Sequence, residues 1–142
     1  MNMRKINLVL LLLVFGSLGL MAQQKDKKLI KAETKFCNSL TAFATALETL
    51  DAMNENSSMD EFRTAYNNAD KAWKKVQKTA AKLEKVDIKE SVAAYNKLVD
   101  AVNGIDGETK TGDATAEVNK HVDATADEIT DIMNVTCQSD DK

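Results

Sequence analysis

The stretch SMDEFRTAYNNADKAWKKVQKTAAKL, residues 58–83, decides the fold of this chain. Its apolar residues recur at steps of four and three without a break, which is the spacing of one buried face of an α-helix. They are Phe62, Tyr66, Ala69, Trp73, Val76, Ala80 and Leu83. Ser58 followed by Glu61 forms a capping-box pattern at the start of this helix. The stretch therefore predicts an amphipathic helix that must bury one face against the rest of the chain.

Three further segments show the same helical periodicity: residues 25–54, residues 88–102 and the stretch that begins at Asp113. Their apolar sets are Leu29, Phe36, Leu40, Phe43, Leu47 and Leu50; Ile88, Val92, Tyr95, Val99 and Val102; and Val118, Val122, Thr125, Ile129 and Ile132. Asp87 with Glu90 is a candidate second capping box, and Asp113 is a candidate N-cap of the last helix. The sequence thus predicts four helices.

The 142 residues contain no proline, and three glycines lie together between Gly104 and Gly112. This composition argues against an all-β or α/β fold, and the length fits one domain. We expect an all-α, up-down-up-down four-helix bundle. The alternative joins the second and third helices into one rod over residues 59–103, flanked by a shorter helix at each end. A slip in the helical phase near residue 86 predicts a break between the two helices. Burial favours the bundle, because the rod leaves its apolar faces half covered.

The first 22 residues have the layout of a secretory signal peptide. Arg4 and Lys5 precede an apolar run from Ile6 to Met21, and small residues lead to Ala22. We therefore expect a signal peptide over 1–22, a helical domain over 23–137 and a frayed tail over 138–142. An uncleaved membrane anchor is the alternative, although a helix needs about 20 apolar residues to span a bilayer. The leader resembles those of bacterial exported proteins, which indicates a periplasmic or secreted location.

Both cysteines, Cys37 and Cys137, lie in the part of the chain that remains after cleavage. In an exported protein, two cysteines indicate one disulfide, because the compartment is oxidising. A free thiol or a thiol nucleophile is the alternative. In an antiparallel bundle the two residues fall at the same end, so the pairing agrees with the predicted fold.

The sequence contains few residues that carry catalytic or metal chemistry. It has one histidine, which excludes a di-metal site built on two Glu-x-x-His pairs and zinc sites with two or three histidines. Glu117 and His121 are a weak candidate pair of metal ligands, because residues four apart share a helix face. There is no P-loop and no Cys-x-x-Cys motif. We therefore expect a protein that is not an enzyme and has no cofactor.

The predicted layout is similar to that of the exported four-helix cytochromes of the b562 type. In that family a methionine early in the first helix and a histidine late in the fourth bind haem. At those places this chain has Cys37 and Cys137, so the haem ligands do not carry over. A carrier of a small ligand, a metal or haem, using the bundle interior and His121, stays as the alternative function.

The second helix also carries a row of lysines opposite its apolar face: Lys71, Lys74, Lys75, Lys78, Lys82 and Lys85. The last helix is acidic, with Asp123, Asp127 and Asp131 among its charges. The row is a candidate surface for an unknown protein or an anionic glycan of the cell envelope. A solvated face that pairs with the acidic helix is the alternative. Nucleic acid is not expected, because no aromatic residues alternate with the lysines. We expect an exported, non-enzymatic binding or structural module.

The leader gives the first testable prediction. Because signal peptidase accepts small residues before its cleavage site, the exported protein should begin at Gln23. Its net charge would then be −5 instead of −3, since Arg4 and Lys5 leave with the leader. Intact-mass spectrometry of the exported protein checks this, and a mass that includes the leader would contradict it.

Overall fold

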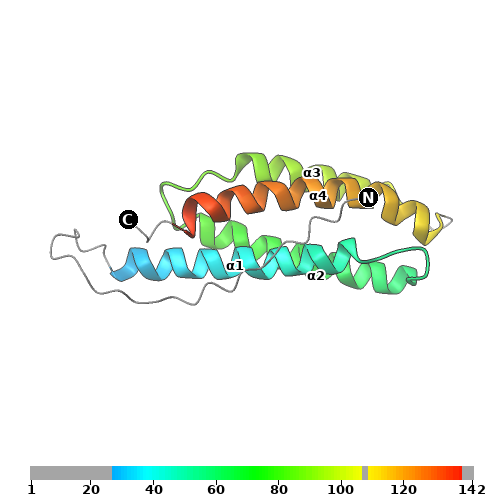
Figure 1. Ribbon diagram of the computed structural model, residues 1–142, viewed down its shortest axis with the longest axis horizontal. Helices are drawn as coiled ribbons and strands as arrows, with labels where there is room; N and C mark the ends of the chain where they lie inside the picture. Colours follow the sequence, from blue (N-terminus) through cyan, green and yellow to red (C-terminus); the bar gives the residue numbers. More distant parts are fainter. Residues whose placement is uncertain (1–26, 107–108, 139–142) are drawn as a thin grey trace.

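The computed structural model describes residues 27–106 and 109–138, and within these residues every regular element is a helix (Figure 1). The helices are α1, Lys27–Asp51; α2, Met59–Ala80; α3, Lys89–Asn103; and α4, Thr111–Thr136. Consecutive helices run in opposite directions, so the predicted four-helix bundle is confirmed and the rod is wrong. The predicted signal peptide lies outside the described residues, as does the predicted tail beyond Gln138. None of the described helices is long and apolar enough to cross a membrane.

The four helices form two layers, with α1 and α2 in one and α3 and α4 in the other (Figure 1). α1 packs closely on both α2 and α4, and α3 packs closely on α4. α2 and α3 meet chiefly through large side chains: the ring centroids of Trp73 and Tyr95 are 5.0 Å apart, and the Tyr95 hydroxyl donates to Asp70 Oδ1. α2 and α4 therefore occupy opposite corners of the bundle.

The predicted apolar faces of α1, α2 and α4 form the core. The largest fully buried side chains are Phe36, Leu40, Phe43, Leu47, Leu50, Phe62, Val76, Leu98, Val118, Val122, Thr125 and Ile129. An aromatic cluster of Phe43, Trp73 and Tyr95 fills the space between α1, α2 and α3, with ring centroids 5.0 to 5.7 Å apart. Aromatic pairs at this spacing add stabilisation beyond the area they bury.

Several of the predicted core positions are not fully buried. On α3 the buried residues are Ser91, Tyr95 and Leu98, while the other members of its predicted set are only half-buried. The buried face of α3 is centred on Tyr95, whose ring packs against Phe43 of α1 and Trp73 of α2. Leu29 on α1 is 40% exposed. The hydrogen bond between Ser39 Oγ and Thr79 Oγ1 puts Ser39 level with the end of α2, so Leu29 lies beyond the end of that helix.

Of the three predicted helix starts, the structure confirms the capping box at Ser58 and contradicts the other two. The Ser58 capping box is present, since Glu61 N donates to Ser58 Oγ and Ser58 N donates to Glu61 Oε2. The second box is wrong: Asp87 Oδ1 accepts from Lys89 N, the first helical residue, and caps no later turn. Asp113 is also not an N-cap, because α4 begins at Thr111 and Asp113 lies in its first turn.

A disulfide between Cys37 and Cys137 joins α1 to the end of α4, as predicted, and their Cα atoms are 5.9 Å apart. It links residues 100 positions apart and encloses most of the described chain. A cross-link over a loop of that length removes much of the conformational freedom of the unfolded chain. The bond therefore stabilises the contact between the first and last helices.

Replacement of both cysteines by serine should lower the free energy of unfolding by up to about 4–5 kcal/mol, the chain-entropy value for a loop of this length. A domain of this size has about 5–15 kcal/mol in total, so urea unfolding will show the loss clearly. Reduction of the wild-type protein is the matched control and should lower stability by a similar amount. An unchanged urea midpoint would remove the structural role of the disulfide.

Candidate functional site: the lysine face of α2

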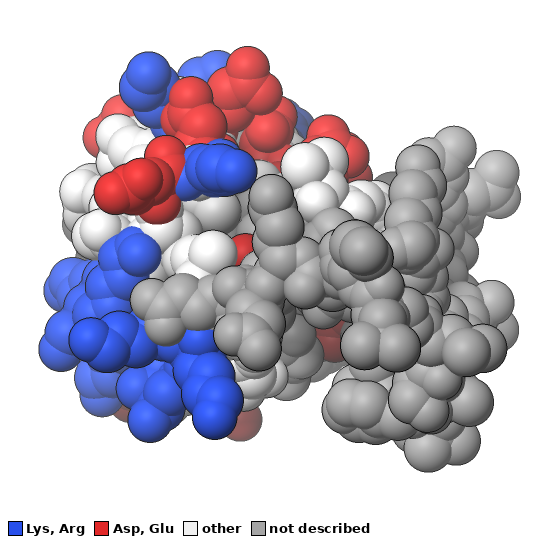
Figure 2. All heavy atoms as spheres, turned by 90° about the vertical axis from the view of Figure 1, so that its left-hand side faces the viewer, with Lys and Arg blue, Asp and Glu red and all other residues white. Residues whose placement is uncertain are grey.

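The six predicted lysines lie on the outside of the bundle. Lys71, Lys74, Lys75 and Lys78 belong to α2, and Lys82 and Lys85 follow in its connection to α3. All six side chains are exposed. We call these six residues the lysine face. In the view along the bundle axis, basic side chains gather in one area at the lower left, in the layer of α1 and α2 (Figure 2).

Lys74 differs from the other five lysines because it belongs to a network that reaches the core. Its Nζ lies 2.7 Å from Asp70 Oδ2, while Asp70 Oδ1 accepts the hydroxyl of the buried Tyr95 at 2.9 Å. The hydrogen bond to Asp70 and its negative charge raise the pKa of Lys74. No ion pair joins the other five lysines to any residue that the structure describes. Their ammonium groups are available to a partner.

Lysines of α1 enlarge this surface, and the sequence analysis missed them. Ser39 Oγ and Thr79 Oγ1 are 2.7 Å apart where α1 and α2 meet. Because α1 and α2 are antiparallel, Lys35, one turn before Ser39, lies on the same side of this contact as Lys82, about one turn after Thr79. Lys35 and Lys31, a turn further, are exposed. The position of Lys31 and Lys35 beside the lysine face follows from the register of the two antiparallel helices. The periodicity of each helix alone does not indicate it.

Most acidic residues of α4 lie away from the lysine face, but Asp131 lines a surface pocket together with Lys85, which follows the end of α2. Asp123, Asp127 and Asp131 are exposed on the outside of α4, at the corner of the bundle opposite α2. No ion pair between described residues joins α2 to α4. Asp51 of α1 also carries a negative charge near α4. Burial, and then the charge of Asp123, raise the pKa of Asp51. The two charged faces therefore do not neutralise each other within one molecule.

The two candidate metal ligands, Glu117 and His121, lie near each other, but Lys120 lies closer to Glu117 than His121 does. His121 Nε2 lies 3.8 Å from Glu117 Oε1, and Lys120 Nζ lies 3.1 Å from Glu117 Oε2. The hydrogen bond and charge of Lys120 lower the pKa of Glu117 more than His121 does. The residues described include no group of three or more His, Cys, Asp or Glu side chains suited to a metal. Glu117 thus acts mainly as a partner of Lys120.

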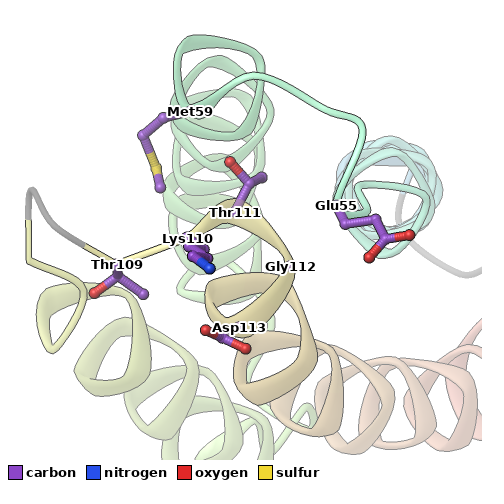
Figure 3. A pocket seen from close by; sticks show the side chains of 7 residues that line it. All are labelled: Glu55, Met59, Thr109, Lys110, Thr111, Gly112 and Asp113. Atoms are coloured by element: carbon purple, nitrogen blue, oxygen red, sulfur yellow. The ribbon is translucent and has the colours of Figure 1, made fainter.

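A surface pocket of about 530 Å³ lies at the other end of the bundle, where the α1–α2 connection meets the start of α4 (Figure 3). It is lined by Glu55, Met59, Thr109, Lys110, Thr111, Gly112 and Asp113. A Cβ on Gly112 would lie 3.0 Å from Glu55 Cβ, so the absent side chain allows this close approach. The charged side chains do not converge on one point (Figure 3). The pocket therefore gives no catalytic arrangement.

The chain matches no family model, and no curated protein or solved structure is significantly similar to it.

Because the lysine face is exposed, its removal should not affect folding. Changing Lys71, Lys75 and Lys78 together to Gln should alter the free energy of unfolding by no more than about 0.5 kcal/mol per residue. Lys74 is left in place to keep its ion pair with Asp70. Circular dichroism and urea unfolding check this result. Loss of the helical signal would show that these lysines pack against another part of the chain.

Proposed function

We propose that this protein is an exported, non-enzymatic binding module that uses the lysine face of α2 to bind an anionic partner outside the cytoplasm. The observation that carries the proposal is the set of five exposed lysines that form no ion pair with the described residues, gathered on one side of a disulfide-linked bundle. The disulfide is compatible with an oxidising compartment. The leader-like N-terminus supports export.

The arrangement of the lysines supports an extended anion. Lys71, Lys75 and Lys78 follow one another at four and three residues, which puts their Cα atoms about 5–6 Å apart along the helix axis. Lys31 and Lys35 widen the surface onto α1. Several ammonium groups along a line favour a partner that repeats its negative charges, such as an acidic glycan, over a single small anion.

The overall charge supports a directed contact instead of general attraction to anions. The chain has an excess of acidic residues, so the molecule as a whole repels a polyanion. Charges separated by more than the Debye length, about 8 Å at 0.15 M salt, are largely screened. The charges on the face turned toward the partner then determine whether the two molecules attract each other. A polyanion should consequently bind on the α1–α2 layer and avoid α4.

The proposal is tested with immobilised heparin as a probe for anionic glycans. The wild-type protein should be retained at low salt and released as salt is raised, because the contact is between exposed charges. The Lys71, Lys75 and Lys78 to Gln variant should be released at clearly lower salt.

The control variant changes Lys97, Lys110 and Lys120 to Gln, which removes the same charge from exposed positions on other parts of the surface. It should be released close to the salt concentration that releases the wild type. Equal loss of retention in both variants would show that net charge, and not the lysine face, determines binding. A wild-type protein that is not retained at low salt would contradict the proposed function.

A further inference from the structure

The two charged faces of this molecule have a geometry that fits them to each other. The lysine face lies on α2, and the outer face of α4 carries Asp123, Asp127 and Asp131. Because these helices occupy opposite corners, Lys71, Lys75 and Lys78 point away from the α4 face within one chain, whereas Lys85, beyond the end of α2, lines a pocket with Asp131. Neither set, Lys74 aside, has an ion pair with the residues described. Apart from Lys74, the charged side chains of both faces thus lack an oppositely charged partner among the described residues of a single molecule.

The spacing of charges on the two faces is similar. Asp123, Asp127 and Asp131 recur every four residues and extend over about 12 Å of helix. Lys71, Lys75 and Lys78 extend over about 10 Å. A basic and an acidic helix face of matched length can form several ion pairs at once when they lie side by side. No single exposed pair contributes much, but a row of them adds directed attraction.

We infer that the acidic face of α4 in a second copy of this chain binds the lysine face of α2. The inference rests on the proposed function, because it assigns one anionic partner to the same lysine face. An anionic glycan and a second copy then compete for these lysines. Self-association keeps the lysine face covered until a glycan of higher charge density displaces the neighbouring molecule.

The geometry also determines the kind of assembly. In the up-down-up-down bundle α2 and α4 run in the same direction, and their outer faces point to opposite sides (Figure 1). A contact between α2 of one copy and α4 of the next leaves one α4 face and one α2 face free at the two ends. Because the two faces point to opposite sides, two copies cannot pair both faces with each other, and the contact is head-to-tail. Association should therefore grow continuously with protein concentration and not stop at a dimer.

The experiment is sedimentation velocity of the exported protein over a concentration series. At about 0.01 M salt, where the Debye length is about 30 Å, the average sedimentation coefficient should rise steadily with concentration. At about 0.5 M salt the protein should sediment as a monomer, since screening then acts within a few ångströms. A wild-type chain that remains monomeric at millimolar concentration and low salt would overturn the inference.

Charge reversal identifies the faces. One variant changes Lys71, Lys75 and Lys78 to Glu, and the other changes Asp123, Asp127 and Asp131 to Lys. Each alone should stay monomeric at low salt, because its two faces then carry the same sign. An equimolar mixture should associate, and so should the chain with all six changes, because opposite faces are restored. A mixture that stays monomeric, or a single variant that associates like the wild type, would overturn the inference.

Two further measurements separate this inference from the proposed function and from misfolding. The Asp123, Asp127 and Asp131 to Lys variant should still bind heparin, because its lysine face is intact. A wild-type protein that binds heparin but never associates would defeat the inference and leave the proposed function standing. Milder variants, with Gln for the lysines or Asn for the aspartates, should weaken association about tenfold or more while the helical signal is retained.

Discussion

The buried apolar face of α1 is the constraint on which the rest of the structure depends. α1 packs closely on both α2 and α4, and its Phe36, Leu40, Phe43, Leu47 and Leu50 are almost fully buried. Burial of each such side chain contributes about 1.5–3 kcal/mol. The disulfide fixes the same helix to the end of α4. With α1 between them, α2 and α4 are held apart.

This separation gives the molecule its two-sided surface. If α2 and α4 were neighbours, the lysines of one helix would face the aspartates of the other, and the pairs would be satisfied internally. At opposite corners, each row faces outward instead. The α2–α3 contact, made by Trp73, Tyr95 and Asp70, includes Lys74 but leaves the other lysines exposed. The packing of the core thus decides which charges are available to partners.

The sequence predicted the four helices, the disulfide and the exposure of the lysine face, because these follow from periodicity and cysteine content. It did not predict which side of α3 is buried, because that depends on the packing of Tyr95 against Phe43 of α1 and Trp73 of α2. The start of α4 was missed since Gly112, beside Glu55, allows an approach that no helix propensity indicates. Lys31 and Lys35 were missed for a similar reason: their place beside the lysine face depends on helix register. Local sequence patterns predicted the helices, whereas contacts between helices determine which side of each helix is buried.

The central claim is that the charged faces of α2 and α4 are apart within one chain and meet only between chains. Zero-length carbodiimide cross-linking of lysines to carboxylates, on an equal mixture of unlabelled and ¹⁵N-labelled protein at low salt, tests it directly. The account predicts cross-links between Lys75 or Lys78 and Asp127 or Asp131 in which half of the linked peptides combine the two isotopes, as random pairing between chains requires. Cross-links between these residues that never combine the isotopes would place α2 beside α4 in one molecule and contradict the account.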